Sequence, residues 1–194
     1  MLAEMEMASL GKMAGAIFLG LSAAGSAFGA GAAAPAAIGA WKKCYAQNKS
    51  VPFMLLAFIG APLSQTIYGM IIMNRIVKIC TLSTYLPATA IKTAQDAAGP
   101  AAASNWLSFI PADVMASATQ AMAAQVINWP TMLGVGIAGG AAMGLSAWLQ
   151  GVAGAAASDA LAETGQGAGN YLMALGIIET VAIFVLVFIG RVLA

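Results

Sequence analysis

The chain contains 194 residues, of which 61% are hydrophobic and only 8% carry a charge, whereas an ordinary soluble domain has about 25% charged residues. So few polar side chains cannot cover a water-soluble globule of this size. The net charge of +1 excludes a strongly basic nucleic-acid-binding protein. The absence of histidine excludes His-based triads and metal centres, and two cysteines are too few for a disulfide framework. The composition therefore indicates an integral membrane protein with several helices.

Four apolar stretches are long enough to cross a membrane. An α-helix rises about 1.5 Å per residue, so roughly 20 residues cross the ~30 Å of hydrocarbon. Because lipid offers the backbone no hydrogen-bond partners, we expect these stretches to be helical. The predicted spans are approximately residues 11–40, 51–77, 131–157 and 169–193.

Short polar links, at residues 46–50 and 164–167, join the first pair of spans and the last pair. The sequence therefore predicts an all-α membrane protein built from two tandem helical hairpins, residues 1–78 and residues 131–194. The intervening segment, residues 79–130, is longer and contains several prolines. Its part from Pro111 to Asn128 carries apolar residues near one face, which predicts a short amphipathic helix at the membrane interface or over the membrane part.

Basic residues favour the cytoplasmic side of a membrane and so predict the orientation. Lys42, Lys43 and Lys49 gather at the first link. This places both short links in the cytoplasm and, with an even number of spans, both termini outside the plasma membrane. Three other basic residues argue weakly for the opposite orientation, although they can snorkel at the outer helix ends: Arg75, Lys78 and Arg191.

A cleaved signal peptide is the alternative interpretation of residues 1–34. The apolar stretch and the small residues at positions 27–34 would suit one. However, Glu4 and Glu6 make the N-terminal end acidic, where a signal peptide carries positive charge. We therefore favour a first membrane span.

The spans alternate between two kinds of helix. The first and third are dominated by Gly, Ala and Ser, and the second and fourth carry bulkier side chains. Many copies could close into a ring with the small-residue helices inside, but a monomeric four-helix bundle accounts for the pattern equally well. Glycines four residues apart allow helix backbones to approach closely in lipid, and those expected at helix contacts are Gly25, Gly29, Gly136, Gly140 and Gly144.

Glu179 is the acidic residue inside a predicted span. A charge at the bilayer centre costs at least ~2.5–3.5 kcal/mol, so such a group is a functional hypothesis by default. Counted from the links, Gln65, Gln150 and Glu179 all lie about 20 Å deep, whereas the first span offers no such group at that depth. The alternatives are a protonated structural glutamate and simple helix-to-helix hydrogen bonds of the two glutamines.

A carboxylate with several neutral oxygens is a suitable cage for a small hard cation. We expect Glu179, Gln150, Gln65 and the Ser64 hydroxyl to bind Na⁺, with the backbone carbonyl of Ala61 as a further ligand beside Pro62. A proton would need only the carboxyl group, so the additional amides favour Na⁺ over H⁺. Three residues are expected to surround these ligands: Tyr68 and Thr180 as donors to the carboxylate, and Thr66 as a donor to a carbonyl, such as that of Phe58, freed by Pro62.

Three runs of the sequence, residues 60–69, 144–151 and 178–180, resemble the membrane rotor proteolipid (the K subunit) of V/A-type ATPases, in its sodium-binding form. The resemblance covers all four spans. It implies a non-catalytic subunit that forms a ring and carries the ion past a stator. It also implies that Ser64, Gln65, Gln150, Glu179 and the Ala61 carbonyl form the ion cage, with Tyr68 hydrogen-bonded to the glutamate.

The implied partners are further copies of the chain, a stator subunit with a basic residue, a central-stalk subunit at the cytoplasmic links, and lipids; no nucleic acid is expected. Ser64 departs from the usual Thr, Ala61 replaces a larger apolar residue, and residues 79–130 exceed the expected short connection. Because Gln65 stands where the second hairpin has Glu179, each chain should carry one ion. A small cation-coupled antiporter and a structural or pore-forming oligomer remain alternatives from other classes.

Overall fold

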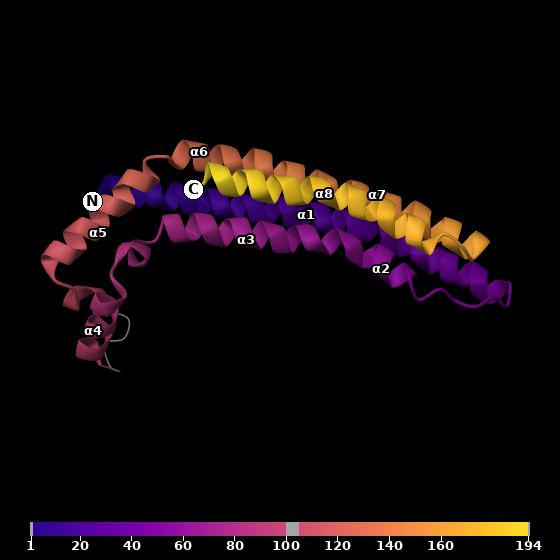
Figure 1. Cartoon of the computed structure of the whole chain (residues 1–194), viewed down its shortest axis with the longest axis horizontal. Coiled ribbons are helices and arrows are strands. Elements are labelled where there is room, and N and C mark those ends of the chain that lie inside the picture. Colours follow the sequence, from indigo (N-terminus) through magenta and orange to yellow (C-terminus); the bar gives the residue numbers. More distant parts are fainter. Residues whose placement is uncertain (1, 100–104, 194) are drawn as a thin grey trace.

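The computed structural model describes residues 2–99 and 105–193, and within these ranges it contains helices and no strand. Four helical stretches are long and apolar enough to cross a membrane: Met5–Ala46, Leu55–Ile79, Trp129–Thr164 and Ala168–Val192. The predicted all-α fold with four membrane-spanning helices is therefore confirmed. The helices form one elongated bundle, with both termini at one end and the short links at the other (Figure 1).

The first hairpin consists of α1 (Leu2–Ala46) and a broken second helix. Helix α1 is longer at both ends than the predicted span of residues 11–40, because good helix formers flank the apolar part, and it continues through Pro35. The second helix begins at Leu55, later than the predicted residue 51, and contains α2 (Leu55–Gly60), a 3₁₀ turn (Ala61–Leu63) and α3 (Ser64–Ile79). Pro62 causes this break, because it has no N–H for the helical hydrogen bond.

The second hairpin begins with a helix in three parts: α6 (Trp129–Gly134), a π-helical turn (Val135–Gly139) and α7 (Gly140–Thr164). Its partner is α8 (Ala168–Val192). The link between α7 and α8 contains two glycines with positive φ, Gly165 at 67° and Gly167 at 86°. Glycine adopts this backbone conformation without a steric penalty, so these two residues allow the chain to reverse tightly.

Helix α1 packs most extensively along α7, which brings the two small-residue helices together in the centre of the bundle. The glycines expected at helix contacts lie on this seam. A Cβ atom at Gly25 would collide with the backbone of Gly144, and one at Gly29 with the carbonyl oxygen of Ala147. A Cβ at Gly136 would lie 2.5 Å from the carbonyl oxygen of Ala14, so the backbones are already in contact. Gly140 likewise lies against the backbone of Phe18 on α1.

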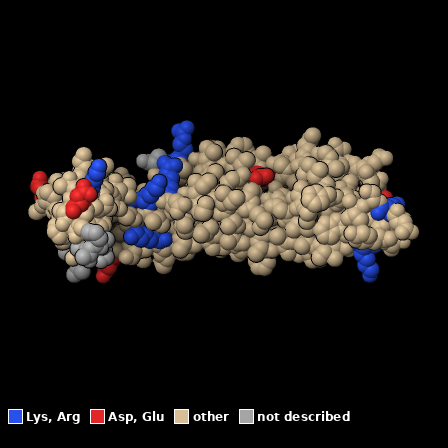
Figure 2. Space-filling view, turned by 90° about the horizontal axis from the view of Figure 1, so that it is seen from below, with Lys and Arg blue, Asp and Glu red and all other residues tan. Residues whose placement is uncertain are grey.

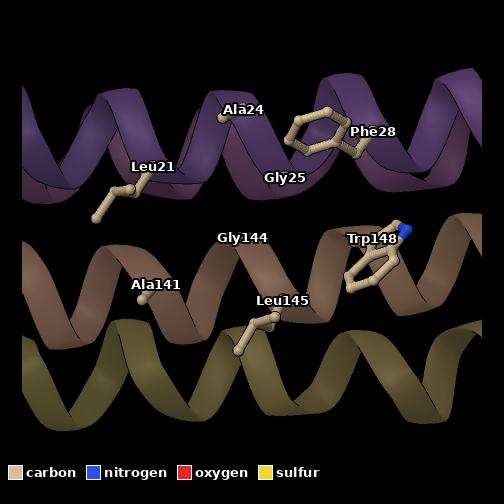
Figure 3. A pocket seen from close by; sticks show the side chains of 8 residues that line it. All are labelled: Leu21, Ala24, Gly25, Phe28, Ala141, Gly144, Leu145 and Trp148. Atoms are coloured by element: carbon tan, nitrogen blue, oxygen red, sulfur yellow. The ribbon is translucent and has the colours of Figure 1, made fainter.

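A groove of about 520 Å³ follows the outer side of the α1–α7 seam. Gly25 and Gly144 form its floor, and larger side chains such as Phe28 and Trp148 border it (Figure 3). Its lining is almost entirely apolar. It is therefore suited to hydrocarbon rather than to a water-soluble molecule.

The described parts of residues 79–130, residues 79–99 and 105–130, form a helical extension at the end of the bundle that holds the termini (Figure 1). It contains α4 (Ala88–Ala98) and α5 (Ala112–Val126), with 3₁₀ turns at Leu82–Tyr85 and Trp106–Phe109. Residues 100–104 of this segment, including Pro100, lie outside the described residues. Helix α5 falls within the predicted amphipathic stretch and buries Ala118, Met122 and Val126.

The basic residues are divided between the two ends of the bundle. Near the short links, Lys43 is paired with Asp159 and Glu163 on α7, at 2.8 Å from each carboxylate. These groups are well exposed, and surface ion pairs contribute little to stability. Three of the eight Lys and Arg residues lie near the links and five lie in the half that holds the termini. A count of basic residues alone therefore does not favour the predicted orientation.

Candidate ion-binding site

The helix break at Pro62 exposes backbone and hydroxyl oxygens inside the bundle. The Ala61 carbonyl accepts a hydrogen bond from the backbone N–H of Ser64. The Ser64 hydroxyl lies 3.1 Å from the Ala61 carbonyl oxygen and 3.1 Å from Oε1 of Gln65, and its single proton can go to either. Ala61, Ser64 and Gln65 thus form one connected group of oxygens at the start of α3.

Two glutamines from different hairpins meet in the centre of the bundle. Gln65 on α3 and Gln150 on α7 both have a relative exposure of 0%. The Gln65 Nε2 donates to Gln150 Oε1 at 2.8 Å, and Gln150 Nε2 donates to the carbonyl oxygen of Leu175 on α8 at 3.1 Å. Each amide oxygen keeps a second lone pair. This chain of hydrogen bonds joins α3, α7 and α8 at a single level.

Glu179 lies midway along α8 and is half-buried in the single chain. Its Oε1 accepts a hydrogen bond of 2.9 Å from the hydroxyl of Tyr68 on α3. Of the residues on the same side of α8, Leu175 and Ala182 are buried and Ile183 is 41% exposed. The space-filling view shows one acidic group midway along an otherwise uncharged surface (Figure 2). The ionisable group thus lies at the border between the buried and the exposed sides of α8.

The structure does not bring every predicted site residue together. Glu179 makes no hydrogen bond to Gln65 or Gln150 within the described residues; the two amides bond each other and the carboxylate bonds Tyr68. The expectation that Thr180 donates to the carboxylate is wrong, because its hydroxyl is exposed and donates to the Ile177 carbonyl at 2.6 Å. Because consecutive residues on a helix point about 100° apart, Thr180 faces away from the carboxylate of Glu179.

The expected bond between the Thr66 hydroxyl and a carbonyl freed by Pro62 is not among the hydrogen bonds of the described residues. The carbonyl oxygen of Phe58, four residues before Pro62, instead faces Gly154 on α7, where a Cβ atom would lie 2.8 Å from it. Thr66 is half-buried one turn beyond the break. Because Pro62 has no N–H, the carbonyl of Phe58 packs closely against Gly154 of α7 instead of forming a new contact with a hydroxyl group.

Sequence reasoning missed two polar contacts on α7 and α8. The Leu175 carbonyl accepts from Gln150, and the Ser146 hydroxyl donates to the Ile178 carbonyl at 3.1 Å. Ser146 lies four residues before Gln150, so helical spacing could have placed it on the same face. A backbone acceptor such as Leu175 carries no sequence signal.

The first span was expected to offer no carboxylate or amide at this depth, and the structure places a buried hydroxyl of α1 there. Ser26 is 2% exposed, and its hydroxyl has no hydrogen-bond partner in the described part of the chain. On the same helix, Gly29 lies against Pro62, and Ser22 contacts Gly69. Since Ser26 falls between these two contacts, it lies at the level of Gln65.

Residues 133–189 match the family model for the c-subunit of ATP synthase. This match supports an ATP synthase c-subunit-type proteolipid, a non-catalytic membrane subunit of a kind that forms oligomeric rings. The corresponding comparisons gave no match among curated proteins and none among solved structures. The family match, together with four apolar helices, also supports a multi-pass membrane protein.

The matched region spans less than a third of the chain. It lies entirely within the second hairpin, from the end of α6 into α8. It includes Gln150 and Glu179, and it excludes Ser64, Gln65 and Tyr68. The family match therefore does not bear on the contacts between the two hairpins, which are seen in this structure only.

Proposed function

We propose that the chain is the rotor subunit of a rotary V/A-type ATPase or ATP synthase and carries one Na⁺ per copy at Glu179. The carrying observation is that Gln65 and Gln150 bond each other inside the apolar bundle and that Glu179 lies about one helical turn further along, bonded to Tyr68. Gln150 and Glu179 both lie in the matched hairpin. Only the carboxylate can carry charge in this set. One acid per chain corresponds to one monovalent cation per chain.

The oxygens available to the ion belong to a carboxylate, two amides, one hydroxyl and one backbone carbonyl. Hard cations such as Na⁺ prefer such oxygen ligands. Both amide oxygens retain a lone pair in the present hydrogen-bond arrangement. Binding of the cation would require Glu179 to turn toward the amides, with Tyr68 following its carboxylate.

Neutralisation of Glu179 is the physical basis of the proposed rotation. An ionised carboxylate facing hydrocarbon is costly, whereas a carboxylate paired with Na⁺ is neutral overall. A loaded copy can therefore pass through lipid, and a basic residue of the stator would release the ion. The stator and a central stalk at the short links belong to this proposal. So does a plasma-membrane location with both termini outside.

Carbodiimide labelling tests the ion assignment, because the reagent attacks protonated carboxyl groups in apolar surroundings. We expect Glu179 to be labelled near neutral pH in the purified full-length oligomer, and added Na⁺ to slow the labelling. K⁺ at equal concentration serves as the ionic-strength control. An unchanged rate in Na⁺ would overturn the sodium assignment while leaving the rotor function intact.

Protons are the second candidate cargo, and one observation favours them. The two amides already satisfy each other and the Leu175 carbonyl, while Glu179 bonds only Tyr68 among the described groups. A protonated carboxyl needs no further oxygens. In that case labelling of Glu179 would follow pH and would not respond to Na⁺.

The oligomeric state separates the rotor from a small cation-coupled antiporter. Native mass measurement of the detergent-solubilised protein should give a closed ring of many copies. A dimer would instead support the antiporter. This measurement is independent of the ion that the chain carries.

A further inference from the structure

A second groove, between α3 and α8, begins about one helical turn beyond Tyr68 and extends toward the end of the bundle that holds the termini. Its volume is about 390 Å³. Ile71 and Arg75 line it on α3, and Leu186, Val187 and Arg191 line it on α8. Apolar side chains and two guanidinium groups thus share one groove.

Gly190 makes room for a close approach between α3 and α8. A Cβ atom at Gly190 would lie 3.2 Å from Nη1 of Arg75, so this guanidinium lies over the backbone of α8, next in sequence to Arg191. Within the described residues, no carboxylate lies within salt-bridge distance of either arginine. Basic groups also gather toward this end of the bundle in Figure 2, and acidic groups lie beside and beyond them at the same end.

The position of the two arginines along the bundle corresponds to the edge of the hydrocarbon. Arg191 lies twelve residues beyond Glu179 on α8, which is about 18 Å along the helix. At this depth a side chain meets lipid headgroups. The arginine fork binds phosphate oxygens in a bidentate manner, and basic clusters at helix ends attract anionic lipids.

We propose that this groove binds an anionic phospholipid, with its phosphate at Arg75 and Arg191 and an acyl chain along Ile71 and Val187. The charge of the two arginines is complementary to the headgroup, and the apolar part of the groove is complementary to the chain. The proposal requires only a membrane-embedded protein and does not depend on the rotor function.

The test measures lipid selectivity of the full-length protein in vesicles with spin-labelled phosphatidylglycerol and spin-labelled phosphatidylcholine. The wild type should prefer phosphatidylglycerol. In the double variant Arg75→Gln/Arg191→Gln this preference should fall by about twenty-five-fold, since each basic group near an anionic surface contributes about fivefold. An unchanged preference in a variant with wild-type helicity would overturn the proposal.

Two further variants and one competitor make the result specific. Lys92→Gln removes an exposed cation from α4 and should leave the preference unchanged. Arg75→Lys/Arg191→Lys keeps both charges and should retain most of the preference, even if the Gln variant fails to fold. Millimolar inorganic phosphate should not compete; if it abolishes the preference, the groove binds free phosphate rather than lipid. A preference lost equally in Lys92→Gln would show only a general surface-charge effect.

Discussion

The two hairpins follow the same plan but differ in their outer helices. Each begins with a small-residue helix, α1 or α7, and continues with a bulkier one. In the first hairpin the bulkier helix is broken at Pro62 and carries a fully buried Gln65. In the second it is continuous and carries Glu179 on a more exposed surface.

This difference shows how one chain can present a single ionisable group. The break at Pro62 lets Gln65 and Ser64 contribute oxygens in the interior, where they are bonded to other protein groups. Glu179 on the unbroken α8 lies at the border of the exposed surface, within reach of one hydroxyl from the first hairpin. In the proposed site, the first hairpin would therefore supply only neutral oxygens, and the second would supply the charge together with the Gln150 amide.

The largest effect is expected from Glu179→Gln, which gives the second hairpin the same amide as the first. Without a carboxylate no monovalent cation can be neutralised, so ATP-driven uptake of radioactive Na⁺ by vesicles containing the assembled complex should fall to background. Glu163→Gln, which alters an acid at the link, is the matched control and should transport normally. Persistent uptake in Glu179→Gln would show that the ion path lies elsewhere.

A smaller effect is expected at the seam that joins the hairpins. Gly25→Ala forces a methyl group against the backbone of Gly144. Overpacking of this kind costs about 1–3 kcal/mol. The thermal transition of the purified oligomer in detergent should therefore shift downward.

Gly20→Ala is the matched control for this seam, since it adds the same methyl group on α1 where nothing lies within 4 Å. Because alanine favours a helix over glycine, the thermal transition of this variant should not fall below that of the wild type. Equal destabilisation by both variants would mean that the methyl group acts through the helix itself and not through contact between the hairpins.

The sequence was sufficient for the number of spans, because apolar length is a local property. The depth count placed Gln65 and Gln150 at one level, where they bond each other, but it missed Ser26 on α1. Sequence reasoning did not determine the directions in which Glu179 and Thr180 point. Direction around a helix depends on which neighbour packs against it, and Ser26 and the Leu175 carbonyl became visible as site groups only after α1, α3, α7 and α8 were assembled.

The Tyr68–Glu179 hydrogen bond is the contact through which the first hairpin reaches the charged group of the second. Tyr68→Phe removes the donor and keeps the ring, so packing between α3 and α8 should be preserved. The bond lies in a partly exposed position, and we expect its loss to change the reactivity of Glu179 by about fivefold, equivalent to about 1 kcal/mol.

Carbodiimide labelling of Glu179 measures this effect, and the rate should rise in Tyr68→Phe because the carboxyl group is no longer held by the hydroxyl. Tyr45→Phe, at an exposed position near the first link, should label at the wild-type rate. The size of the Na⁺ effect then distinguishes two roles. If Tyr68 only orients Glu179, protection by Na⁺ should weaken in the Phe variant but persist, because the ligand oxygens of Gln65 and Gln150 are intact. If protection disappears entirely, the phenol is indispensable for loading, and the division between a neutral first hairpin and a charged second hairpin must include this hydroxyl. A labelling rate identical to that of the wild type would mean that the carboxyl group spends most of its time away from Tyr68.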